Sequence, residues 1–157
     1  QEDMMQLAID TAIKGSYLRD GDSVVGVLGN MDIPNGYNSV KLITVGDIIL
    51  KGQGIGNGIV SGRVAIVKSL FDINKRAHNK IVAIAATDTE HLGLIEEAAG
   101  LIVEEGGLSS HAAIACMTLG KPIIVGATDA TEQLLEDEQI TMDVMRGLVY
   151  RGWVNLG

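Results

Sequence analysis

The stretch that decides the fold is LIVEEGGLSSHAAIACMTLG, residues 101–120. It leads from a short apolar run through a glycine-rich loop into a segment of helix-forming residues that stops at Gly120. Strand, tight loop and helix in this order aim backbone N–H groups at an anion. The loop delivers one histidine, His111, to the start of the predicted helix. The sequence therefore predicts an α/β unit with a candidate anion site.

Strands and helices are predicted on both sides of this stretch. Residues 59–67 alternate as a strand, and residues 81–86 are continuously apolar, as in a strand covered on both faces. Residues 89–98 follow the helical repeat, residues 122–126 form another apolar run, and residues 139–151 read as a hairpin. This alternation predicts an α/β domain with a partly parallel sheet.

The first third of the chain has a different pattern. Apolar residues recur at helical spacing over residues 4–17, and two strands are predicted at 23–28 and 40–45 with a polar loop at 29–39.

A glycine-rich connector follows. Residues 51–58 hold four glycines, which predicts a hinge; a phosphate loop is the weaker alternative, because no Lys-Ser/Thr ending follows. We therefore predict three parts, namely a first domain at 1–52, a hinge at 53–58 and a second domain at 59–157.

Composition and charge exclude several classes of protein. The chain has 157 residues and a formal net charge of −8, which argues against nucleic acid or an anionic membrane as a main partner. Its single cysteine excludes an internal disulfide, and no Cys/His cluster has metal-ligand spacing. No apolar run approaches the length of about 18 residues that a spanning helix needs. A cytoplasmic protein without a metal of its own is the expectation.

The candidate site residues gather around His111. An imidazole is a good nucleophile near pH 7 and can carry a phosphoryl group. The predicted anion-binding residues are the loop glycines Gly106 and Gly107 and, through their hydroxyls, Ser109 and Ser110. The alternative makes one serine a helix N-cap and His111 a surface residue.

Other polar residues are expected to be structural. Cys116 falls on the buried face of the predicted helix and reads as a structural thiol. His91 lies in the first turns of a helix and is expected to be exposed. The acidic run at 132–138 is expected to be a solvated surface and no metal site.

The histidine loop and the Leu-Gly-Lys-Pro-Ile-Ile-Val-Gly segment at 119–126 resemble the mobile, or swivelling, domain of phosphoenolpyruvate-utilising enzymes. The resemblance covers residues 59–157 and implies a phosphohistidine-type β/β/α fold. It also implies that His111 is the residue that is transiently phosphorylated. The family's Thr is Ser109 here, and Met117 stands where working carriers have an arginine, which an apolar thioether cannot replace.

The first 58 residues resemble the end of the C domain of bacterial pyruvate kinases. The similar segments include Gly21 to Val25, Val45 to Asp47 and Lys51 to Gly56. Bacillus-type members of that family append a mobile domain to a C domain, in the order found here. The resemblance implies an effector loop, with Tyr37 in the place of a threonine, made of Pro34, Asn35, Gly36, Tyr37, Asn38 and Ser39. The alternative for this loop is a plain turn between two strands.

Two functions follow from these resemblances. The first is a regulatory and structural C-terminal region of a pyruvate kinase, a glycolytic enzyme that moves phosphate from phosphoenolpyruvate to ADP. The alternative is a working phosphohistidine carrier that uses His111. The parent reaction implies Mg2+ and K+ on a catalytic barrel outside this chain, so the isolated chain is expected to be inactive. Expected partners are the rest of the kinase chain, further subunits of a tetramer, and phosphate or a phosphometabolite.

Overall fold

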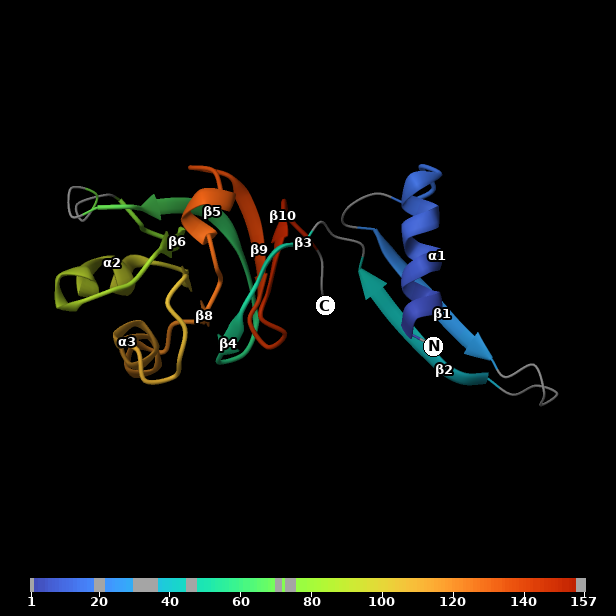
Figure 1. Cartoon of the computed structure of the whole chain (residues 1–157), viewed down its shortest axis with the longest axis horizontal. Coiled ribbons are helices and arrows are strands. Elements are labelled where there is room, and N and C mark those ends of the chain that lie inside the picture. Colours follow the sequence, from blue (N-terminus) through green and yellow to red (C-terminus); the bar gives the residue numbers. More distant parts are fainter. Residues whose placement is uncertain are drawn as a thin grey trace. The chain divides into compact units, whose positions relative to one another are not determined.

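The computed structural model describes residues 2–18, 22–29, 37–44, 48–69, 72 and 76–154, and it divides into two compact units (Figure 1). Unit 1 comprises Gln1–Asp47 and Val154–Gly157, and unit 2 comprises Ile48–Trp153. The predicted boundary at 53–58 differs from this division, because the structure separates the units between Asp47 and Ile48.

Unit 1 holds one helix and a hairpin. Helix α1 spans Glu2–Lys14, and strands β1 (Ser23–Gly29) and β2 (Tyr37–Thr44) pair antiparallel, with Ser23 opposite Thr44. The helix and both strands confirm the sequence prediction. Strand β2 begins three residues earlier than predicted, so the end of the predicted polar loop is strand.

Unit 2 contains eight strands among its described residues, in the order β3-β10-β9-β5-β6-β7-β8-β4. The strands are β3 (Ile48–Lys51), β4 (Gln53–Ile55), β5 (Ile59–Val67), β6 (Ile81–Ile84), β7 (Gly100–Val103), β8 (Ile123–Val125), β9 (Gln139–Asp143) and β10 (Leu148–Arg151). The helices are η2 (Thr89–His91), α2 (Leu92–Glu97), α3 (His111–Leu119) and α4 (Ala130–Gln133). Strands β5 to β8 pair parallel and the other pairs are antiparallel, which confirms the predicted partly parallel sheet.

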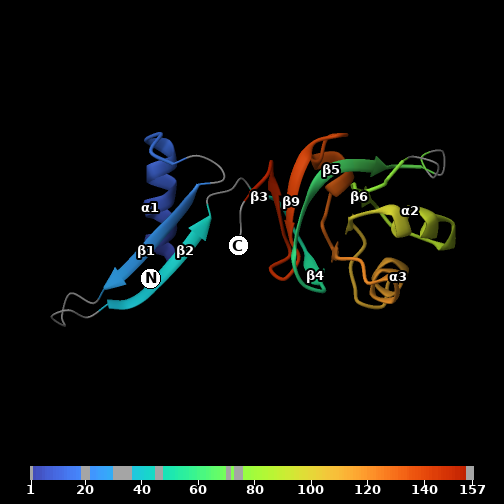
Figure 2. The same ribbon diagram turned by 180° about the vertical axis from the view of Figure 1, so that it is seen from behind.

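The strands and helices of unit 2 stack in three layers, β/β/α. Figures 1 and 2 both show α2 and α3 on one side of the parallel strands, with β9 and β10 on the other. Strand β6 explains the arrangement, because its side chains alternate between two cores. Val82 and Ile84 pack with the helices, whereas Ile81 and Ala83 pack with the second layer of strands. All four are buried, as the continuously apolar sequence predicts.

The segment from 48 to 55 closes the sheet. Its first half, β3, pairs with β10, and its second half, β4, pairs with β8. Because only Gly52 separates β3 from β4, one continuous piece of chain occupies both ends of the strand order. The predicted hinge therefore contains a strand, and composition alone misassigned it.

Close backbone packing explains the glycines in this segment. The N–H of Gly52 donates to the carbonyl of Gly147 at 2.8 Å. A Cβ added to Gly54 would overlap the carbonyl oxygen of Val144, and one added to Gly147 would overlap that of Gly52. Gly147 also has a φ of +66°, a conformation that L side chains rarely adopt. These glycines let two pieces of backbone touch.

We predict that Gly54→Ala lowers the free energy of unfolding by about 3 kcal/mol, because the carbonyl of Val144 must move to make room for the methyl group. Urea unfolding followed by circular dichroism measures the change. The matched control is Gly93→Ala on α2, where an added Cβ meets no atom within 4 Å. We expect that variant to be unchanged or more stable by up to about 1 kcal/mol. Equal unfolding free energies for wild type and Gly54→Ala would contradict the close-packing account.

Candidate functional site

His111 is the first residue of α3, directly after the loop that follows β7. The helix begins there because Ser110 acts as the N-cap, with extended backbone angles of φ −64° and ψ 154°. It ends at Gly120, which adopts the left-handed conformation. The predicted strand, loop and helix around the histidine are confirmed.

Hydrogen bonds within the loop hold it in place. The Ser110 hydroxyl donates to the carbonyl of Gly107 at 3.0 Å and accepts from the N–H of Ala113 at 3.3 Å. Gly107 has a φ of +103°, so this position needs a glycine. Gly106 packs close to Gly126, because a Cβ added to Gly106 would lie 3.7 Å from the Cα of Gly126. The Ser110 hydroxyl is thus already committed as a cap.

Ser109 differs from Ser110 in its surroundings. Its side chain is exposed, and within the described ranges no hydrogen bond is recorded for it. Of the two predicted serines, Ser109 is therefore the one with a hydroxyl free to donate to an anion.

Thr87 is the residue at this site that sequence reasoning missed. Its Oγ1 lies 2.9 Å from Nδ1 of His111, and its side chain is only 9% exposed. The contact occupies one ring nitrogen and leaves Nε2 without a recorded partner among the residues the structure describes. The position of Thr87 in the sequence could have revealed this contact. Thr87 follows the apolar run of β6, and the carboxyl ends of neighbouring parallel strands meet at one edge of a sheet.

The acidic residue at the end of β7 has a structural role. Glu104 Oε1 accepts from the N–H of Thr131 at 2.9 Å and from its hydroxyl at 2.7 Å. This carboxylate holds the start of α4 and is half-buried. The neighbouring Glu105 is exposed. Glu104 is therefore committed to packing α4.

The other predicted structural residues can now be placed. Cys116 is fully buried, and burial raises the pKa of its thiol to about 11, so it is neutral and inert near pH 7. His91 was predicted to be exposed and this was wrong: it is 7% exposed, and its Nδ1 accepts from the backbone N–H of Asp88 at 3.1 Å. This contact completes a capping box at η2.

The acidic run at 132–138 is tied to the surrounding strands. Glu132 pairs with Lys68 at 3.1 Å, Asp137 pairs with Lys80 at 2.8 Å, and Glu138 pairs with Arg151. Glu132 and Asp137 are exposed, as predicted, whereas the Glu138 side chain is only 10% exposed and lies inside its ion pair. Across the described part of the chain, no three Asp, Glu, His or Cys side chains are grouped so as to hold a metal ion. No helix in that part has the length and apolar character needed to span a bilayer.

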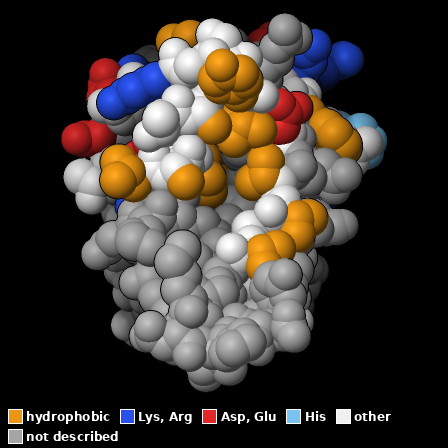
Figure 3. Space-filling model, turned by 90° about the vertical axis from the view of Figure 1, so that its right-hand side faces the viewer, with side chains coloured by type: hydrophobic (Ala, Val, Ile, Leu, Met, Phe, Trp, Pro, Cys, Tyr) orange, Lys and Arg blue, Asp and Glu red, His pale blue; other side chains and the backbone are white. Residues whose placement is uncertain are grey.

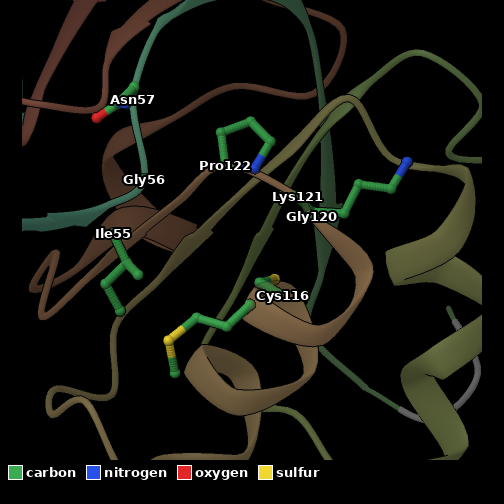
Figure 4. A pocket seen from close by; sticks show the side chains of 8 residues that line it. Ile55, Gly56, Asn57, Cys116, Gly120, Lys121 and Pro122 are labelled. Atoms are coloured by element: carbon green, nitrogen blue, oxygen red, sulfur yellow. The ribbon is translucent and has the colours of Figure 1, made fainter.

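A cavity of about 290 Å³ lies at the other end of α3 (Figure 4). Figure 4 shows Ile55 and Cys116 facing the space between β4 and α3, with the amino end of Lys121 pointing away from it. Met117, in the position of the carriers' arginine, lines this cavity and is 53% exposed. His111 is not among its lining residues, which are Ile55, Gly56, Asn57, Cys116, Met117, Gly120, Lys121 and Pro122. The position that would hold the cation is therefore part of an apolar surface.

The predicted effector loop is only partly visible. Pro34, Asn35 and Gly36 lie outside the described residues, whereas Tyr37, Asn38 and Ser39 open strand β2. Tyr37 is paired with Gly29 and Ser39 with Leu28. These three residues therefore lie in a strand and not in a loop, and their part in an effector site stays a prediction.

Comparison with known proteins supports the resemblance on which these residues were chosen. Residues 77–147 match the family model described as "PEP-utilising enzyme, mobile domain". A pyruvate kinase of Bacillus licheniformis is 38% identical over 152 residues, which covers 96% of this chain and 26% of the relative. Pyruvate kinase 2 of Synechocystis is 36% identical over 94% of this chain and 25% of the relative. The chain thus spans about a quarter of the length of the relatives it matches.

Solved structures show the same fold at low sequence identity. The crystal structure of Thermococcus kodakaraensis aconitase X in its holo-form matches 65% of this chain and 96% of its own chain, with a TM-score of 0.50 and 18% identity. A solution structure of a UPF0107 protein matches 64% of this chain, with a TM-score of 0.50 and 12% identity. At these identities the likeness concerns the fold alone.

We predict that Ser110→Ala lowers the free energy of unfolding by about 1 kcal/mol, because the helix loses its cap and the loop loses its bond to Gly107. Ser109→Ala is the matched control and is expected to stay within about 0.5 kcal/mol of wild type. Parallel urea titrations of the three proteins measure both changes. Equal effects at the two serines would show that the cap does not hold the loop.

Proposed function

The chain carries a mobile domain of the phosphoenolpyruvate-utilising enzyme family at residues 77–147, and from this premise we propose that it is the C-terminal structural and regulatory region of a pyruvate kinase. One observation carries the proposal. Similarity to pyruvate kinases runs through both units, over 96% of this chain, and matches only a C-terminal quarter of the relatives. If the mobile domain belonged to an unrelated enzyme, unit 1 would not be expected to match pyruvate kinases as well.

The surface of unit 1 supports a place in a longer protein. Its exposed apolar side chains include Leu7 at 67%, Tyr17 at 85% and, on one face of β1, Val25 at 63% and Val27 at 51%. Figure 3 shows apolar side chains spread over the described part of this side of the molecule. A two-stranded hairpin with one helix has little core of its own, so such a surface calls for further cover. The missing part of a kinase C domain would supply it.

The parent reaction transfers a phosphoryl group from phosphoenolpyruvate to ADP and gives pyruvate and ATP. In this proposal that step takes place in the cytoplasm, on a barrel outside the 157 residues, together with Mg2+ and K+. The partners of the chain are then the rest of its own polypeptide and the other subunits of a tetramer. The residues at 34–39 would form one side of an effector site whose other side lies in the missing part of the C domain.

The second candidate function is a phosphohistidine carrier, and the Thr87 contact favours it. In the tautomer in which Nδ1–H of His111 donates to the Thr87 hydroxyl oxygen, Nε2 carries the lone pair and is the nitrogen left to attack phosphorus. The N–H groups around Gly106 and Gly107 and the hydroxyl of Ser109 would then face the phosphoryl oxygens. Met117 speaks against this function, because no guanidinium stands at that position to neutralise the phosphate.

We predict that the purified 157-residue chain forms no pyruvate from phosphoenolpyruvate and ADP when Mg2+ and K+ are present. A coupled lactate dehydrogenase assay detects pyruvate, and the Bacillus licheniformis enzyme serves as the positive control. Pyruvate formation above the protein-free rate would overturn the assignment as a non-catalytic region.

For the carrier, we predict no stable phosphohistidine in the full-length kinase after incubation with phosphoenolpyruvate labelled on its phosphate. The measurement is acid-labile, base-stable label on the protein. Label that disappears in His111→Ala, persists in the exposed-surface control His78→Ala and falls in Thr87→Val would establish the carrier instead.

A further inference from the structure

The loop between β4 and β5 contains an asparagine followed by a glycine, Asn57–Gly58, whose side-chain amide is uncommitted. Asn57 is exposed, and within the described ranges no hydrogen bond is recorded for its amide. Figure 4 shows this side chain at the edge of the cavity, away from Cys116. Among the described residues, no contact therefore holds the amide carbon away from a nucleophile on the backbone.

The backbone nitrogen that follows is equally free. Across the described residues, the N–H of Gly58 donates to no recorded acceptor. Gly58 has a φ of +105°, and a Cβ added there would meet no atom within 4 Å. The space around this nitrogen is open, and glycine puts no side chain in the way.

A second exposed asparagine, Asn79, shows the opposite arrangement. The backbone nitrogen that follows it belongs to Lys80, and its N–H donates to the carbonyl of Ala77 at 2.9 Å. That bond keeps the nitrogen in a turn and directs its proton away from the Asn79 side chain. The structure thus distinguishes two asparagines that are both exposed to solvent.

We propose that Asn57–Gly58 is a site of spontaneous deamidation. The backbone nitrogen of Gly58 loses its proton and bonds to Cγ of Asn57, the bond from Cγ to the side-chain nitrogen breaks, and ammonia leaves. Water then opens the resulting five-membered imide at either carbonyl and gives aspartate or isoaspartate. The reaction needs only water and no catalyst, oxidant or reductant.

The position of this site ties the reaction to the closure of the sheet. The carbonyl of Gly58 accepts from the N–H of Val144 at 3.1 Å, next to the turn on which Gly52 and Gly54 pack. Isoaspartate adds a methylene to the backbone one residue before this bond. An aged chain would therefore carry an extra negative charge and a loosened junction between the two layers of strands.

Incubation of the 157-residue chain in mildly alkaline buffer, once native and once in urea, tests the proposal. Trypsin cleaves after Lys51 and Arg63, so the peptide 52–63 contains Asn57 as its only asparagine. Mass spectrometry follows the mass gained when NH2 is replaced by OH. We expect Asn57 to react at nearly the same rate in both states, whereas folding slows Asn79 several-fold. A rate for Asn57 that falls as far as that of Asn79 on folding would overturn the proposal.

Two variants separate the chemistry from its effect on the fold. Asn57→Gln keeps the amide but needs a larger ring, so its peptide should stay unmodified. Asn57→Asp carries the new charge with a normal backbone. Thermal melts should show a lower midpoint for aged wild type than for fresh Asn57→Asp and no ageing effect in Asn57→Gln. Equal midpoints for fresh and aged wild type, with the peptide modified, would refute the link to sheet closure.

Discussion

Unit 2 depends on one backbone crossing, where residues 48–55 pass the turn at 144–147. The contact is between main chains, because any Cβ on Gly54 or Gly147 would overlap a carbonyl oxygen across it. It lets a single piece of chain pair with β10 on one side and β8 on the other. Strands β3 and β4 thereby cover the edges of β10 and β8, and unpaired strand edges are the part of a sheet most prone to pair with other chains.

The parallel strands inside this closed arrangement determine where the chemistry can lie. Their carboxyl ends bring together Thr87 from the end of β6 and the loop that follows β7, which carries His111. Local hydrogen bonds already occupy two polar side chains near that loop, since Ser110 caps α3 and Glu104 binds the start of α4. What remains available is the outer ring nitrogen of His111, the hydroxyl of Ser109 and an apolar helix surface at Met117. If this site binds an anion, as we propose, it does so with Met117 in the place of a cation.

Sequence alone predicted much of the architecture because the apolar pattern of unit 2 is unambiguous. Buried parallel strands such as β6 and β7 read as continuous apolar runs, and the loop at 106–110 carries both a glycine signal and a cap signal. The segment at 53–58 was predicted to be a hinge although residues 53–55 form β4, because its glycines serve a long-range contact that no local pattern reveals. Thr87 was missed for the same reason, since its partner lies 24 residues along the chain. His91 was misplaced because a capping box draws it inward.

The pairing of β3 with β10 has a consequence for how unit 2 can be passed between proteins. Ile48 stands opposite Tyr150, so the first and last strands of the unit are hydrogen-bonded neighbours. Paired residues of an antiparallel ladder lie about 5 Å apart, which is the gap that a surface loop of a host protein can bridge. Unit 2 can therefore be inserted into a surface loop of another chain, or removed from it, with little change to the backbone of that chain. Domains whose termini lie close together tolerate insertion into other chains and circular permutation.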